Sequence, residues 1–257
     1  PPNDATDIAA ALERLGFQVL KGHDLDKRGM DRMVTTFARA ATDADVALFF
    51  YAGHGMQFQG ANYLMPVDAK LEDEVSLPFE MTRLDDVIGS VSRARGVKLI
   101  ILDACRDNPL AQRLQLKATN RSIGPTRGFS KIERTQGTVI AYATQANDVA
   151  TDGEGRNSPF TTALLKDIET PNLEVGTLFR RVTAEVNRLT NGRQTPELSV
   201  SILGEFYFRR SETDLQVWTR VRETGGRADF EDFMARFPTS PLVDAARARI
   251  AALDRTD

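Results

Sequence analysis

Apolar residues follow two alternating patterns over the first 210 positions, one typical of helices and one typical of buried strands. Apolar residues three or four positions apart predict amphipathic helices near 3–15, 30–41, 84–91, 158–168 and 177–189. Short runs that are apolar throughout predict strands at 17–20, 46–51, 97–102, 139–142 and 200–203. Strands without a polar face, separated by helices, indicate an α/β fold with a mainly parallel central sheet flanked by helices.

Two segments depart from this alternation. Gly60 and Asn62 within 56–68 predict a hairpin attached to the sheet. The segment 106–136 has weak periodicity and carries seven Lys or Arg residues against two acidic ones. It predicts a long exposed loop, and such loops in compact domains are usually functional or disordered. A solvated basic loop without a role is the alternative.

The last 47 residues, 211–257, have a different pattern of apolar positions from the rest of the chain. They contain three helical stripes and no apolar run of the strand type, which predicts a small helical appendage after a first domain at 1–208. We expect Trp218 and the phenylalanines of this segment to form its own core. Its helices form a repeat-like arrangement that would serve packing or the binding of a protein partner.

Composition removes several classes of function. The chain has 257 residues, one cysteine and two histidines, which excludes an internal disulfide and a structural zinc site of the usual Cys/His kind. The 33 Lys and Arg residues against 36 Asp and Glu give a formal charge of −3, which argues against a nucleic-acid binder. No apolar run approaches the about 18 residues of a membrane span. The usual serine-hydrolase, P-loop and dinucleotide motifs are absent.

Two of the predicted strands run into reactive side chains. His54 follows the strand at 46–51 within Ala-Gly-His-Gly, and Cys105 follows the strand at 97–102 within Asp-Ala-Cys-Arg. Sites in parallel α/β sheets form beyond the carboxyl ends of strands, so both residues are expected at the functional edge. The 51 positions between them accommodate a hairpin, a helix and a strand, which can set the two strands side by side.

The pair of residue types fits nucleophilic catalysis. A free thiol has a pKa of about 8.5, and a nearby imidazole increases its nucleophilicity at neutral pH. The amides of Gly55 and Cys105 are candidates for an oxyanion hole, since the glycines that flank His54 allow a sharp turn. A lone cysteine or histidine at such a place is more often structural. Both together, each in a strand-end motif, favour chemistry.

Three short motifs resemble those of the caspase-like cysteine peptidases. They are Tyr-Ala-Gly-His-Gly at 51–55, Pro-Val-Asp-Ala at 66–69 and Leu-Asp-Ala-Cys-Arg at 102–106. The chain is most similar to paracaspases and bacterial orthocaspases, which are relatives of the metacaspases, over residues 1–208. This resemblance implies a caspase–haemoglobinase fold and a catalytic dyad of His54 and Cys105. It also implies that the first strand of the family's sheet lies before Pro1.

The same resemblance implies a specificity for basic residues. Animal caspases bind an aspartate before the scissile bond, whereas paracaspases and metacaspases bind Arg or Lys with acidic side chains. Asp4 and Asp103 match two of these acids, and Asp152 matches a third, with Asp148 as its rival. Independently, three carboxylates near a thiol would form a cation pocket, because a buried guanidinium needs paired acceptors. Asp4 is also a candidate helix N-cap, a role that does not exclude the first.

The sequence therefore predicts a cysteine endopeptidase that acts on protein or peptide substrates after Arg or Lys. The basic loop at 106–136 is a candidate for self-cleavage. No cofactor is predicted: metacaspases often need calcium, but the chain has no loop of EF-hand spacing. The alternative function is a caspase-like signalling or scaffold module that acts through its C-terminal helices. The resemblance implies a soluble bacterial protein and leaves the cytoplasm and the periplasm open.

Overall fold

The computed structural model describes residues 1–58, 61–105, 136–145 and 155–254. The chain divides into two compact units, Pro1–Arg209 and Arg210–Asp257. Within the described ranges, no helix is both long enough and apolar enough to cross a membrane.

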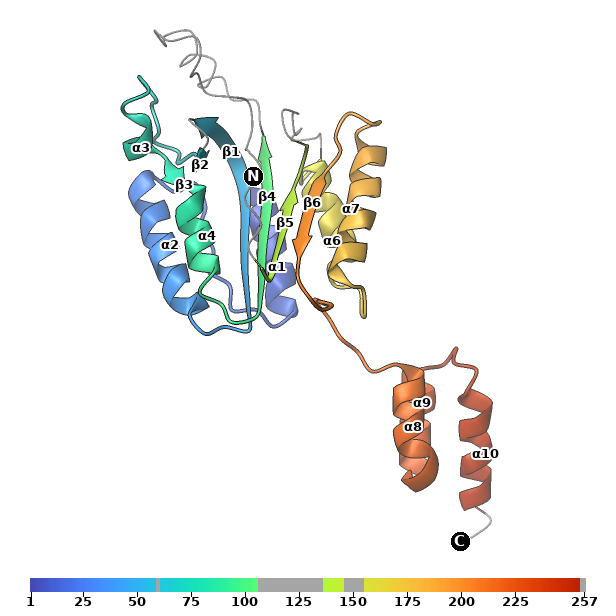
Figure 1. Ribbon diagram of the computed structural model, residues 1–257. Helices are drawn as coiled ribbons and strands as arrows, with labels where there is room; N and C mark the ends of the chain where they lie inside the picture. The colour runs from blue at the N-terminus through green and yellow to red at the C-terminus, as the bar shows by residue number, and fades with distance from the viewer. Residues whose placement is uncertain (59–60, 106–135, 146–154, 255–257) are drawn as a thin grey trace. The chain divides into compact units, whose positions relative to one another are not determined.

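A six-stranded sheet forms the centre of the first unit, in the order β3-β2-β1-β4-β5-β6 (Figure 1). The strands are β1 (Val46–Phe58), β2 (Ala61–Leu64), β3 (Thr82–Arg83), β4 (Val97–Cys105), β5 (Thr138–Tyr142) and β6 (Glu197–Ser201). The three central strands β1, β4 and β5 run parallel, and the outer strands pair antiparallel. The predicted α/β fold with a mainly parallel centre is confirmed, as is the hairpin, which β1 and β2 form.

Helices cover both faces of this sheet (Figure 1). One face carries α1 (Pro2–Arg14), α6 (Pro159–Asp167) and α7 (Val175–Leu189), and the other carries α2 (Lys27–Ala41) and α4 (Leu84–Val91). The short helix α3 (Leu77–Glu80) packs beside the β1–β2 hairpin. Burial on two faces explains why the central strands read as continuous apolar runs rather than as alternating ones.

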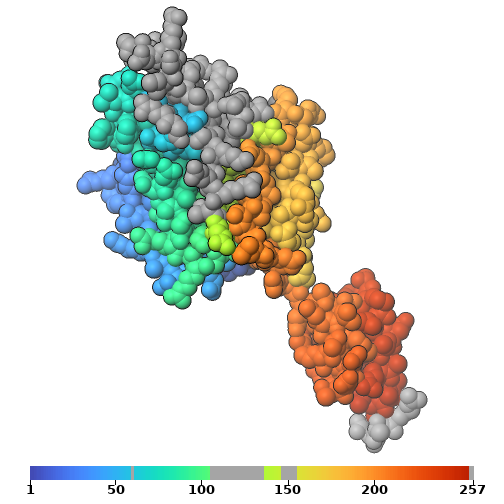
Figure 2. Space-filling model, in the orientation of Figure 1, coloured from blue at the N-terminus to red at the C-terminus, as the bar shows by residue number. Residues whose placement is uncertain are grey.

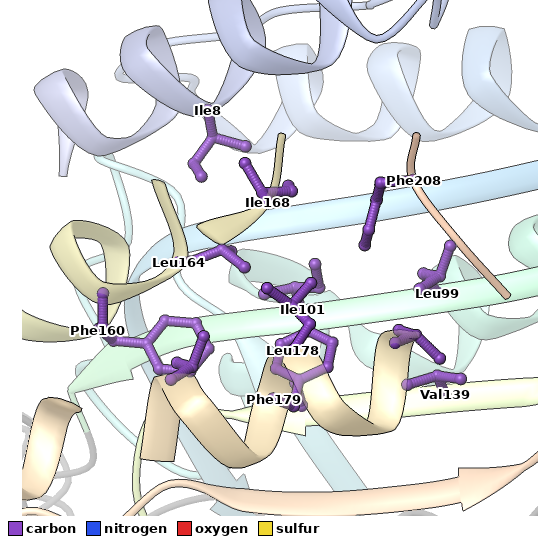
Figure 3. Close-up of a cluster of buried hydrophobic side chains, with 14 of the residues drawn as sticks. Ile8, Leu99, Ile101, Val139, Phe160, Leu164, Ile168, Leu178, Phe179 and Phe208 are labelled. Carbon is purple, nitrogen blue, oxygen red and sulfur yellow. The ribbon is translucent and has the colours of Figure 1, made fainter. Parts of the chain in front are cut away.

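The side chains of β4 show how the two cores divide. Leu99 and Ile101 join the cluster under α1, α6 and α7, where Phe160 is fully buried (Figure 3). Ile100 and Leu102 point the other way and join the cluster under α2 and α4. This alternation places every odd residue of β4, up to Asp103, on the face that α1 and α6 cover.

One strand prediction is wrong and another is displaced along the chain, because a strand also needs a neighbour to pair with. Residues 17–20 form no strand: the Phe17 ring packs 6.2 Å from the Phe208 ring in the core, while Leu20 is 38% exposed. The last strand lies at Glu197–Ser201 rather than at 200–203, because its register with β5 pairs Thr138 with Ser201. Leu203 lies beyond this ladder and is exposed. Figure 2 shows that the chain around β6 lies at the surface of the first unit.

The second unit consists of α8 (Asp214–Thr224), α9 (Arg227–Arg236) and α10 (Val243–Leu253). Its helices enclose their own apolar cluster, with Phe230 and Phe233 almost fully buried. The Trp218 ring lies 6.0 Å from Phe230 and 5.6 Å from Phe233, so it belongs to this core, as its spacing predicts.

Candidate active site

His54 and Cys105 are neighbours across the two central strands. β1 and β4 pair in parallel from Val46 opposite Val97 to His54 opposite Cys105, which is the last pair of the ladder. Adjacent strands lie about 4.8 Å apart, so the two backbones are close at this point. His54 is exposed, and for Cys105 the structure describes the position of the backbone. The expected juxtaposition of the two residues is therefore present at the level of the backbone.

The two strands are longer than their apolar runs predict. His54 lies inside β1 rather than after it, and Cys105 is the last residue of β4. The reason is that β1 exchanges one partner for another: it pairs with β4 up to His54 and with β2 from Gly55 opposite Leu64 onwards. The ladder thus continues through a polar, glycine-containing segment that the apolar pattern alone does not mark as strand.

Asp103 lies two residues before Cys105 on β4 and is buried, with 7% of its surface exposed. Its Oδ2 atom accepts two hydrogen bonds, one from the Ser158 hydroxyl at 2.5 Å and one from the Thr161 hydroxyl at 2.7 Å. Both donors lie at the start of α6, Ser158 as its N-cap and Thr161 in its first turn, and this helix packs on the same face of the sheet.

Asp4 reaches the same place from the first turn of α1. Its Oδ1 atom accepts a hydrogen bond of 2.9 Å from the backbone N–H of Ser158, and the residue is 4% exposed. Asp4 is not the N-cap of α1, since that helix begins at Pro2 with Pro1 as its N-cap; the Oδ2 atom of Asp4 lies 3.1 Å from the nitrogen of Pro1. Ser158 therefore links both acids, with its N–H on Asp4 and its hydroxyl on Asp103.

Ser158 is the N-cap of α6, at the start of the helix that the apolar spacing predicts near 158–168. The Ser158 hydroxyl oxygen accepts the N–H of Thr161 at 2.9 Å, while the same hydroxyl donates to Asp103. The contact to Asp103 spans 55 positions and Thr161 carries no local signal, so neither is visible before the fold is known.

Burial and the neighbouring acid Asp4 both act on the ionisation of Asp103. Burial raises the pKa of Asp103 from 3.8 to about 6, although the hydrogen bonds from Ser158 and Thr161 oppose that rise. The negative charge of Asp4 raises the pKa of Asp103 further. Two carboxylates that are both out of water destabilise each other, and a positive group between them would relieve this.

Several predicted site features lie outside the described residues: Asp148, Asp152 and nearly all of the basic loop at 106–136. Among the residues that are described, no group of three or more His, Cys, Asp or Glu side chains is arranged to hold a metal ion. That the chain works without a cofactor stays a prediction.

Comparisons with known proteins agree with this arrangement of strands and helices. The sequence profile of the caspase domain matches residues 1–207. Among solved structures, the crystal structure of caspase-1 from Spodoptera frugiperda matches with a TM-score of 0.55 and 16% sequence identity, over 82% of each chain. At this identity the likeness concerns the fold. No curated protein matches the chain.

Proposed function

The chain belongs to the caspase-domain family, so its first unit has the fold of a cysteine peptidase that acts on proteins, and we propose that it is an endopeptidase that cleaves after Arg or Lys. The observation that carries this proposal is the pairing of His54 with Cys105 at the end of the β1–β4 ladder, next to the buried Asp103. The proposed nucleophile, the proposed base and one proposed acid of the pocket would then lie within a few residues of the ends of β4 and β1.

In the proposed reaction, the sulfur of Cys105 attacks the carbonyl carbon of the substrate while the thiol proton passes to His54. The imidazolium then donates this proton to the leaving amine as the C–N bond breaks, and the acyl group remains on sulfur. Water hydrolyses the thioester with His54 as the base, which restores the thiol. The amides of Gly55 and Cys105 would stabilise the oxyanion in both steps.

The buried acids support the choice of a basic residue before the scissile bond. A guanidinium or ammonium ion would compensate Asp4 and Asp103, whose charges are held away from water. An aspartate side chain in the same pocket would add a third negative charge. We propose Asp152, with Asp148 as the alternative, as the further acid of the pocket.

The preference for arginine should depend on pH through Asp103. We expect the ratio of kcat/KM for two peptides, identical except for a final Arg or Gln, to increase about 10-fold from pH 5 to pH 7.5. The pKa of Asp103 is raised to about 6, so below that pH the carboxyl is protonated and no longer attracts the guanidinium. The ratio removes every pH effect that the two peptides share, because both use the same dyad.

The control for this experiment is Asp103→Asn, which keeps the shape of the side chain and cannot ionise. Its Arg-to-Gln ratio should be low and should not change with pH. A wild-type ratio that stays constant over the same range would show that Asp103 does not select the arginine.

We further propose that the enzyme cuts its own basic loop at 106–136, whose Lys and Arg residues suit the proposed pocket. Mass spectrometry of the purified wild type after prolonged incubation should find new ends after Lys or Arg in this loop. The Cys105→Ala variant should stay intact. An intact loop in wild-type enzyme that hydrolyses peptides would contradict self-processing and leave the peptidase function standing.

A further inference from the structure

We propose that Tyr51 is a positioning residue for the oxyanion hole: its hydroxyl fixes the peptide group between His54 and Gly55 and so directs the Gly55 N–H at the developing oxyanion. The inference rests on the proposed peptidase function. Nothing in the apolar pattern suggests it, since Tyr51 ends a hydrophobic run and looks like an ordinary core residue.

The carbonyl oxygen of His54 is held by two donors. The Tyr51 hydroxyl donates to it at 2.7 Å, and the backbone N–H of Met65 donates to it at 3.0 Å. The Tyr51 oxygen also lies 3.3 Å from the carbonyl oxygen of Met65, so the hydroxyl sits between the two chains where β1 passes from β4 to β2.

The planarity of the peptide group carries this restraint to Gly55. The carbonyl of His54 and the N–H of Gly55 belong to one trans peptide and therefore point in opposite directions. The carbonyl points toward the chain that continues β2, because Met65 is its donor. The Gly55 N–H must then point toward the β4 side, where Cys105 lies opposite His54. Holding the carbonyl thus holds the amide.

Tyr51 is itself well placed to act as a fixed donor. Its ring stacks on that of Phe49, with the centroids 6.5 Å apart and the planes at 6°. A Cβ atom at Gly53 would lie 2.7 Å from the Tyr51 hydroxyl oxygen, so glycine at this position leaves room for the tyrosine. Burial raises the pKa of Tyr51 well above its usual value, so the hydroxyl keeps its proton at any working pH.

The test compares Tyr51→Phe with wild type in three assays. Hydrolysis of an Arg-ended peptide and inhibition by an Arg-ended peptide aldehyde both create an oxyanion, because the Cys105 thiol adds to a carbonyl in each. Alkylation of Cys105 by iodoacetamide creates none. We expect kcat to decrease about 10-fold or more and the inhibition constant of the aldehyde to increase by a similar factor. KM and the alkylation rate should stay near those of wild type.

Tyr63→Phe is the matched control, since Tyr63 lies on the adjacent strand β2, is buried and makes no hydrogen bond to the His54 carbonyl among the described residues. Its kinetics should equal those of wild type. Unchanged aldehyde affinity in Tyr51→Phe, an alkylation rate that decreases together with kcat, or the same loss in Tyr63→Phe would each overturn the inference. Wild-type enzyme without hydrolysis would instead overturn the proposed function on which it rests.

Discussion

Replacing Cys105 or His54 with alanine is expected to lower kcat/KM for an Arg-ended peptide by about 10³-fold or more. Cys105 supplies the bond-forming sulfur, and His54 supplies both proton transfers of the proposed reaction. The two residues stand opposite each other in the β1–β4 ladder, so we expect them to act as one unit. The variant that lacks both should therefore lose little more activity than either single variant.

The chain offers a control for this experiment, since His23 is its only other histidine. His23→Ala should retain wild-type activity, and all variants should unfold at temperatures close to that of wild type. A fully active Cys105→Ala variant would exclude the dyad. Losses that multiply in the double variant would show that the two residues act independently.

The second large effect concerns Asp103, where specificity and stability should change in opposite directions. Asp103→Asn is expected to lower kcat/KM for Arg-ended peptides by about 10²-fold relative to Gln-ended ones, because the amide cannot pair with a guanidinium. The same substitution should increase the free energy of unfolding at pH 7.5 by up to about 3 kcal/mol. It removes a charge that is buried beside Asp4 and can keep the hydrogen bonds from Ser158 and Thr161.

The sign of the stability effect follows from the raised pKa of Asp103. The folded state holds the proton up to about pH 6, whereas the unfolded state releases it near the usual 3.8. The stabilisation by this proton is fully present below 3.8 and is lost as the pH rises through about 6. The advantage of Asp103→Asn in urea unfolding should therefore shrink between pH 7.5 and pH 4.

Asp7→Asn provides the matched control on α1. Asp7 pairs with Arg156 at 2.8 Å, and that hydrogen bond lowers the pKa of its carboxyl, which is the opposite of the shift at Asp103. Asp7→Asn should slightly destabilise the protein and leave the peptide preference unchanged. An Asp103→Asn variant that is less stable than wild type at pH 7.5 and still prefers arginine would contradict the assigned role of Asp103.

The sequence predicts the central strands well because strands that are buried on two faces consist almost entirely of apolar residues. The runs at 46–51 and 97–102 identify β1 and β4, and the polar residues that follow them identify the edge at which His54 and Cys105 meet. The family resemblance supplies Asp4 and Asp103 as a pair, and the structure brings both to Ser158.

What the sequence cannot predict depends on contacts between distant segments. The hydroxyls of Ser158 and Thr161 reach Asp103 only because α6 packs on β4, and no local pattern encodes that packing. The run at 17–20 has the composition of a strand and packs into the core without a ladder. The hydrogen bond from Tyr51 to the His54 carbonyl arises where β1 changes its partner, a feature of pairing rather than of composition.

Peptidase activity after Arg is tested most directly with two fluorogenic peptides that are identical except for a final Arg or Asp. The rate of fluorophore release by the wild-type chain is measured for each, and the Cys105→Ala variant is the negative control. We expect release from the Arg-ended peptide, little or none from the Asp-ended one, and no release by the variant. Equal rates for wild type and Cys105→Ala would favour a scaffold role for this caspase domain and contradict the peptidase assignment. Cleavage of the Asp-ended peptide alone would contradict the acidic pocket.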